Sequence, residues 1–335
     1  MHSKTSHGTL PVLAALAGNV LIMILKWIGF FVTGSGALFS EAVHSVADVF
    51  NQLLLMVGIK KSQRVADGDF HYGYSNERFF WALISACSIF FLGAGVTVYH
   101  GVIGLLHQEV SHISSIAFVI LAISFVVEAG TFLIALRELR AHNKKRDWRE
   151  TLEYGDPTTI AVLLEDSVAV FGVSIAFVSI LLSKLTGNYL WDSVGSIVIG
   201  VLLGVMAIVL ININRGFLMR KSIPEETEER VIEILENDPA IEKVLDFKSV
   251  VIDIGKYHVK CEVEINGSAL MRGMYRGQAL KNEFKEIAGD YGDFLRFCVD
   301  YADRVPRMIG NRIDEVEKKI KDEVPEVRHI DIEVN

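Results

Sequence analysis

One apolar stretch of this chain carries four polar residues at helical spacing. Glu41, His44, Asp48 and Asn51 are separated by three, four and three positions, so they share one face of a helix. His44 and Asp48 are one turn apart, and both side chains can therefore reach a single ion. An imidazole nitrogen combined with a carboxylate oxygen is a donor set that suits zinc. This face predicts a metal site.

Three more carboxylates lie within other apolar stretches: Glu128 in one, Glu165 and Asp166 in another. With a rise of about 1.5 Å per residue, Asp48 and Asp166 fall roughly 15 and 12 Å into their stretches, from opposite ends. Both positions are near the middle of a hydrocarbon core about 30 Å thick. Carboxylates at this depth are costly and mark ion pathways, or else pair with polar neighbours. We expect a buried ion site, and pairing is an equal alternative for Glu128 and Glu41.

Six stretches have the length and composition to span a bilayer, which takes about 20 apolar residues. They are residues 10–32, 38–59, 79–105, 113–136, 158–185 and 191–213. Lys and Arg gather in the loops after the second and fourth stretches and directly after the sixth, whereas the alternate loops carry almost none. By the positive-inside rule both termini face the cytoplasm. Lys26, in the first stretch, is expected to extend toward the outer interface.

Charged residues become dense beyond Arg215. We therefore interpret residues 1–215 as an all-α six-helix transmembrane domain and residues 216–335 as a small cytoplasmic α+β domain of ferredoxin-like type. The tail is predicted to contain a helix at 225–236, strands at 248–254 and 257–265, helices at 278–288 and 308–323, and a strand at 327–334. The formal net charge of -8 argues against a nucleic-acid partner.

Several motifs resemble the cation diffusion facilitator family of metal/proton antiporters. They are Gly18-Asn19-Val20, the run TGSGALFSEAVHSVAD at 33–48, and His71-Tyr72-Gly73-Tyr74. The resemblance covers nearly the whole chain. It implies six spans with both ends in the cytoplasm, a small α+β tail, and a His-x-x-x-Asp pair in the second span that forms half of a tetrahedral zinc site.

The fifth span departs from the family pattern. When Asp166 is aligned on the last Asp of the family's second ligand pair, Val162 stands where the first ligand is expected. The sequence Leu-Leu-Glu-Asp at 163–166, together with Glu-Ala-Gly at 128–130, looks like a divergent branch of the family that includes the animal mitochondrial zinc exporter. The resemblance carries over three ligands: His44, Asp48 and Asp166. The fourth stays open among Glu165, Glu128, Asn51 and a water.

The family also binds metal in its cytoplasmic tail, between subunits. His329 and Asp331 alternate onto one face of the last predicted strand, and Cys261 falls near a family ligand position on a neighbouring strand. The alternative is that Cys261 is a small core residue, as free cysteines usually are. The resemblance implies a homodimer joined through the tail. In the loop after the second span, Asp67, Asp69 and His71 are further candidates, or only solvated surface groups.

These patterns predict a secondary transporter that exports divalent metal ions, zinc first, by metal/proton exchange through alternating access. No enzyme is expected, since neither His-Glu-x-x-His nor a Walker A motif occurs, and no resident cofactor is expected beyond a structural metal in the tail. The predicted location is a bacterial inner membrane. The alternatives are a manganese or iron exporter of the same fold, a metal-gated channel, an intramembrane metalloenzyme, and a membrane metal sensor or scaffold that transports nothing.

Overall fold

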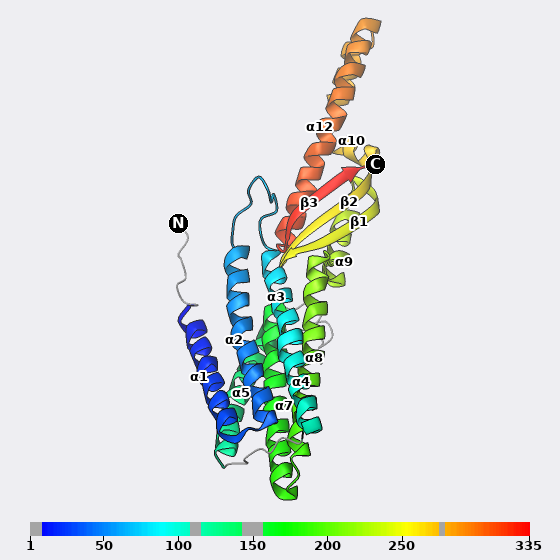
Figure 1. Ribbon diagram of the computed structural model, residues 1–335. Helices are drawn as coiled ribbons and strands as arrows, with labels where there is room; N and C mark the ends of the chain where they lie inside the picture. Colours follow the sequence, from blue (N-terminus) through cyan, green and yellow to red (C-terminus); the bar gives the residue numbers. More distant parts are fainter. Residues whose placement is uncertain (1–8, 108–114, 143–156, 275–278) are drawn as a thin grey trace. The chain divides into compact units, whose positions relative to one another are not determined.

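The computed structural model describes residues 9–107, 115–142, 157–274 and 279–335 (Figure 1). The chain divides into two compact units, Met1–Met219 and Arg220–Asn335. Each unit has its own core, and each is described separately below.

The first unit is a bundle of long helices that run side by side (Figure 1). They are α1 (Thr9–Thr33), α2 (Gly36–Ser62), α3 (Glu77–Ser88), the π-helical η1 (Ile89–Gly95), α4 (Val96–His107), α5 (Ser115–His142), α7 (Pro157–Thr186) and α8 (Leu190–Leu218). Segments α3, η1 and α4 form one continuous helix. The helices match the six predicted stretches within a few residues at most ends.

Within the described ranges, five helices are long and apolar enough to cross a membrane. They are Gly36–Ser62, Glu77–His107, Ser115–Arg137, Ile160–Thr186 and Leu190–Leu218. The apolar part of α1, Gly18–Thr33, is shorter. The prediction of a helical membrane unit is therefore confirmed for five spans, and the count of six remains a prediction.

Close contacts between small residues hold this bundle together. A methyl group added at Gly101 of α4 would lie 2.7 Å from Cγ1 of Ile197, and one at Gly200 of α8 would lie 2.7 Å from Cγ2 of Val98. Only glycine lets the two backbones come this near, which is a common way for helices to associate in lipid. Elsewhere the bundle packs around larger residues: Leu38, Ile89, Leu121, Val173 and Leu203.

A buried carboxylate closes one end of α2. The Asp192 side chain, on the first turn of α8, accepts hydrogen bonds from the Ser35 hydroxyl at 2.7 Å and from the backbone N–H groups of Gly36 and Ala37 at 2.6 and 3.2 Å. The first N–H groups of a helix have no partner within it, and the helix dipole favours negative charge there. Asp192 is only 4% exposed, so it caps α2 and ties it to α8.

We expect Asp192→Ala to destabilise the helical unit, because it leaves two buried N–H groups at the start of α2 without an acceptor. The free energy of unfolding in detergent, measured by denaturant titration, should fall by about 1–3 kcal/mol. Asp314→Ala, at an exposed position in α12, is the matched control and should change little. Equal stability of the Asp192 variant and the control would contradict this role.

The second unit is a three-stranded sheet with helices. Its elements are α9 (Glu225–Glu236), β1 (Ile241–Asp253), β2 (Lys256–Ile265), α10 (Gly267–Met274), α11 (Ala279–Ile287), α12 (Tyr291–Glu323) and β3 (Val327–Val334). Strand β2 lies in the middle, antiparallel to β1 and parallel to β3 (Figure 1). Gly255, with φ of 64°, makes the tight turn between β1 and β2.

Two predictions about this unit differ from the structure. The predicted strand at 248 begins at Ile241, and the predicted helix at 308 begins at Tyr291. Asp290 caps its first turn by accepting from the Asp293 N–H, which sets the start of the helix, and the helix continues through Pro306. An α+β unit was predicted correctly, but the finer ferredoxin-like type is not confirmed, since that fold has four strands and the described residues form three.

Alternate residues of β2 form the core of this unit. Val259, Cys261 and Val263 are buried, together with residues of the flanking helices such as Leu235 of α9 and Ile320 of α12. Burial in this apolar environment raises the pKa of the Cys261 thiol to about 12. At neutral pH the thiol is therefore protonated and unreactive.

This burial predicts selective thiol chemistry. At pH 7.5, N-ethylmaleimide should modify the exposed Cys298 and leave Cys261 unmodified until denaturant is added. Because the Cys261 pKa is raised, increasing the pH to 9 should not expose it to reaction either. Peptide mass spectrometry after timed labelling checks this, with Cys298→Ala to identify the reactive site. Modification of both thiols at similar rates in the folded protein would contradict the assignment.

Candidate metal centre

A polar cavity of about 50 Å³ lies between α1, α2, α5 and α7. Its size allows an ion with one or two water molecules, at about 30 Å³ of liquid volume for each water. The polar residues that line it are Asn19, Ser45, Asp48, Asn51, Gln52, Glu128, Thr131, Glu165 and Asp166. Several of the residues predicted from the sequence to bind metal thus meet at one cavity, although they come from three different helices.

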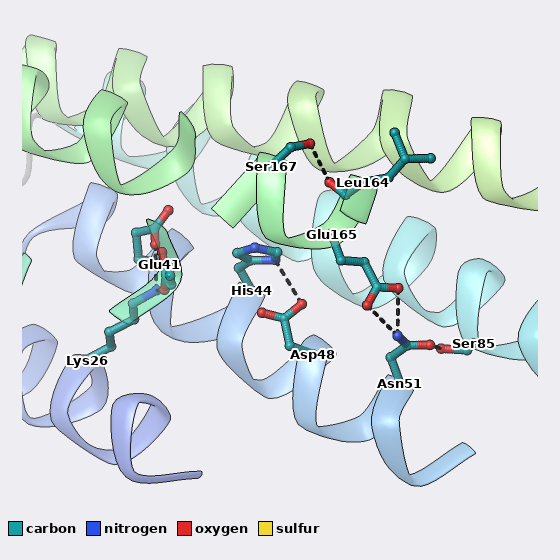
Figure 2. A network of polar contacts seen from close by, with 10 residues as sticks. Lys26, Glu41, His44, Asp48, Asn51, Ser85, Leu164, Glu165 and Ser167 are labelled. Atoms are coloured by element: carbon teal, nitrogen blue, oxygen red, sulfur yellow. Dashed lines mark hydrogen bonds and ion pairs between the residues drawn. The ribbon is translucent and has the colours of Figure 1, made fainter. Parts of the chain in front are cut away.

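His44 and Asp48 face each other on α2, as their spacing predicts. The Nδ1 atom of His44 lies 3.5 Å from Oδ1 of Asp48 (Figure 2). His44 is 1% exposed, and in the part of the chain that the structure describes neither of its ring nitrogens has a hydrogen-bond partner. A buried polar group without a partner is costly and rare. A metal ion bound between the imidazole and the carboxylate would compensate that cost.

Asp166 enters the same cavity from α7, where it is half-buried. Val162, one turn before it, also lines the cavity. Its side chain offers no donor atom, so this position cannot supply the ligand that the family pattern places there. As the described side chains stand, no three His, Cys, Asp or Glu residues are already arranged to hold an ion.

Glu165 and Asn51 are occupied with each other. The Asn51 amide donates to both carboxylate oxygens of Glu165, at 2.6 and 2.5 Å, and accepts a hydrogen bond from the Ser85 hydroxyl of α3. Figure 2 shows Glu165 directed toward Asn51 rather than toward His44 and Asp48. This network connects α2, α3 and α7, and it engages two of the open candidates for the fourth ligand, Glu165 and Asn51.

Lys26 corrects one prediction from the sequence. It is fully buried and does not extend toward the interface. Its ammonium donates to Glu41 at 2.7 Å and to Glu128 at 2.6 Å, which joins α1, α2 and α5 (Figure 2 shows the pair with Glu41). The two carboxylates offset the cost of burying the charge, so the side chain has no reason to seek water. For Glu41 and Glu128 the pairing alternative is what the structure shows.

The tail candidates separate onto two faces of the sheet. Cys261 faces the core, whereas His329 and Asp331 lie on the opposite face of β3. There the Nε2 atom of His258 is 3.0 Å from Oδ2 of Asp331, and the rings of His258 and His329 are 6.0 Å apart. The parallel register of β2 and β3 brings His258 into this group. The alternation along β2 indicates which face of the sheet His258 occupies, but it does not indicate that Asp331 of β3 lies beside it.

The loop between α2 and α3 uses one of its candidate ligands for its own structure. The carboxylate of Asp67 accepts hydrogen bonds from the Tyr74 hydroxyl at 2.7 Å and from the backbone N–H groups of Asp69 and Phe70 at 3.1 Å each. The bond from Tyr74, more than any other contact, lowers the pKa of Asp67. Asp67 organises a turn here, and His71 is exposed beside it.

The sequence matches a known family and several known proteins. The family model of the cation efflux transmembrane domain matches residues 12–219, which include every residue of the cavity. The mitochondrial proton-coupled zinc antiporter SLC30A9 of Homo sapiens is 38% identical over 328 residues, 96% of this chain and 58% of the human protein. The chain thus spans less than two thirds of that relative.

Two further relatives come from a plant and a bacterium. Metal tolerance protein C4 of Arabidopsis thaliana is 36% identical over 338 residues, 98% of this chain and 74% of the plant protein. Magnetosome protein MamM of Paramagnetospirillum magneticum is 21% identical over 238 residues, 70% of each chain. The match to the family model and the identity to the plant protein agree with the helical unit and its cavity: this chain is an integral membrane protein of the cation efflux family, whose members are transporters and not enzymes.

Proposed function

We propose that this protein is a secondary transporter that exports divalent metal ions, with zinc as the first substrate, in exchange for protons. The observation that carries the proposal is the buried imidazole of His44, which lacks a hydrogen-bond partner among the described residues and lies 3.5 Å from Asp48, a residue that lines the polar cavity. A relative with 38% identity is named a proton-coupled zinc antiporter, which supports both the substrate and the coupling.

The proposed ligands are His44, Asp48 and Asp166, with a water in the fourth position. The three side chains named as candidates for this position are engaged elsewhere: Glu165 and Asn51 bind each other, and one oxygen of Glu128 binds Lys26. Three protein ligands and a water are a common arrangement for zinc sites that must exchange what they bind. A water also leaves readily, which suits a site that has to release its ion.

The position of the cavity supports entry from the cytoplasm. Its lining extends from the middle of α2, at Ser45 and Asp48, to Leu55, and it includes residues 162–169 of α7, toward the ends of both helices that the loop charges predict to face inward. At the outer end, Asp192 and its hydrogen bonds close the contact between α2 and α8. In this conformation the ion would reach Asp166 and Asp48 first, and then His44.

Proton exchange follows from the chemistry of the ligands. An imidazole binds metal only when it is neutral, and histidine ordinarily titrates near pH 6.5. Protons from the outer side would therefore displace the ion after the bundle opens outward and would reset the site. A manganese or iron exporter with the same ligands is the second candidate, because the donor set narrows the choice of metal without fixing it.

The proposal extends to assembly and to location. We propose a homodimer joined through the second unit, and a structural metal at His258, His329 and Asp331 without Cys261. The count of six spans, with both termini in the cytoplasm, belongs to the same proposal. The expected bacterial inner membrane has no support, since the human relative is described as mitochondrial.

Removing either ligand of α2 should abolish tight zinc binding. By isothermal titration of the purified protein in detergent, we expect His44→Ala and Asp48→Ala to lose more than about 100-fold in affinity, because removal of an outer-shell partner alone typically costs 10–100-fold. His107→Ala, at an exposed histidine at the end of α4, is the matched control. A folded His44 variant that binds zinc as tightly as the wild type would remove this residue from the site.

Transport itself is tested in proteoliposomes that enclose a fluorescent zinc reporter. With an acidic interior, wild-type protein should drive zinc inward at a rate that follows the pH gradient, and Asp48→Ala should show no flux above empty vesicles. Flux that ignores the gradient would instead indicate a channel. If the protein binds zinc but shows no zinc flux, manganese or iron becomes the proposed substrate and is tested in the same way. If none of the three metals is transported, the protein is instead a metal sensor.

A further inference from the structure

The proposed mechanism leaves the network of Lys26, Glu41 and Glu128 without a task. All three side chains are buried, and they come from α1, α2 and α5. One oxygen of each carboxylate binds the Lys26 ammonium. The second oxygens, Oε1 of Glu41 and Oε2 of Glu128, are buried without a hydrogen-bond partner in the described ranges. A network built only to hold helices together would not need two carboxylates for one ammonium.

We propose that Lys26 determines the metal specificity of the transport site, by holding Glu128 and Glu41 out of the coordination shell of the ion. This inference rests on the proposed function, because it concerns the same site. Lys26 would act as a built-in cation that occupies two oxygen ligands and so leaves the transported metal a nitrogen-containing set with few oxygens.

The positions of the two carboxylates support this role. Glu128 lines the same cavity as Asp48 and Asp166, and Lys26 binds it there at 2.6 Å. Glu41 precedes His44 by three residues on the same face of α2, and Figure 2 shows Glu41 and Lys26 next to the His44 ring. If the ammonium were absent, both carboxylates would lie at the edge of the site with nothing to bind.

The network is also packed too tightly to be displaced by water. Lys26 is 0% exposed, and a methyl group added at Gly172 of α7 would collide with Oε1 of Glu41. The side chains therefore contact all four helices that surround the cavity. In the wild type the two carboxylates stay bound to Lys26 while ions enter and leave.

Ligand chemistry gives the direction of the effect. Zinc favours a tetrahedral set that mixes nitrogen with few oxygens, which His44, Asp48 and Asp166 provide. Manganese and magnesium favour six oxygen ligands. Two extra carboxylates would change the site toward the second kind. Lys26 would therefore select against oxygen-preferring cations by withholding ligands from them.

The test compares zinc and manganese binding to the full-length protein in detergent by isothermal titration. Lys26→Gln should raise manganese affinity by at least 10-fold and narrow the ratio of the two dissociation constants. Lys26→Arg, which keeps the charge and both partners, should retain the wild-type ratio. In the triple variant Lys26→Gln, Glu41→Gln, Glu128→Gln no carboxylate is released, so the gain in manganese affinity should disappear.

A charge-balanced variant guards against misfolding. Lys26→Gln alone leaves two buried carboxylates facing each other, whereas Lys26→Gln with Glu41→Gln has the net charge of the wild type and still releases Glu128. We expect this double variant to gain as much manganese affinity as Lys26→Gln does. A merely structural role of Lys26 would lower the unfolding temperature and leave the affinity ratio unchanged.

The outcomes separate this inference from the proposed function. If the wild type binds zinc, and every folded variant keeps its zinc-to-manganese ratio, the role of Lys26 is wrong and the transport proposal stands. If the wild type binds neither ion, the transport site itself is wrong, and the inference falls with it. A gain in manganese affinity that persists in the triple variant would also overturn it, since no carboxylate is then released.

Discussion

Polar groups inside this helical bundle have to find their partners within the protein, because hydrocarbon offers none. Three networks satisfy this constraint, and each crosses between helices: Asp192 with the start of α2, Asn51 with Glu165, and Lys26 with its two glutamates. Together they fix how α1, α2, α5, α7 and α8 are placed around the cavity. Among the described residues, the ring nitrogens of His44 are left outside these networks, without a hydrogen-bond partner.

This view separates residues of one chemical type by what they contact. Five carboxylates lie at or near the cavity, yet only those of Asp48 and Asp166 are assigned to the ion. Glu165 is held by an amide, and Glu41 and Glu128 are held by an ammonium. A carboxylate that already has a partner in the protein stabilises the bundle, and one without such a partner is available to the transported ion. In the proposed function, a bound metal ion would compensate the buried His44 for the hydrogen bonds that it lacks.

Periodicity and hydropathy predicted most of the elements, because these depend on residues close together in the chain. The helices, the last strand and the shared face of His44 and Asp48 are of this kind. The partners of Lys26 could not be predicted, since Glu41 and Glu128 come from separate helices whose rotation the sequence leaves open. The position of Lys26 deep within α1 was the only feature of the sequence that pointed to a buried partner for this side chain. Likewise, the neighbour of Asp331 depends on the parallel register of β2 and β3, which brings in His258.

The contact between Asp192 and α2 has a mechanical consequence. It ties the first turn of α2 to α8, so that α2 can tilt only about this end, which acts as a pivot. Counted from Gly36 at about 1.5 Å per residue, His44 is roughly 12 Å from the pivot and Asn51 roughly 22 Å. A given swing therefore displaces Asn51 almost twice as far as His44. A tilt of α2 about this end would therefore stretch the bond between Asn51 and Glu165 more than it would displace the His44 ring, so this bond is the contact that such a motion strains first.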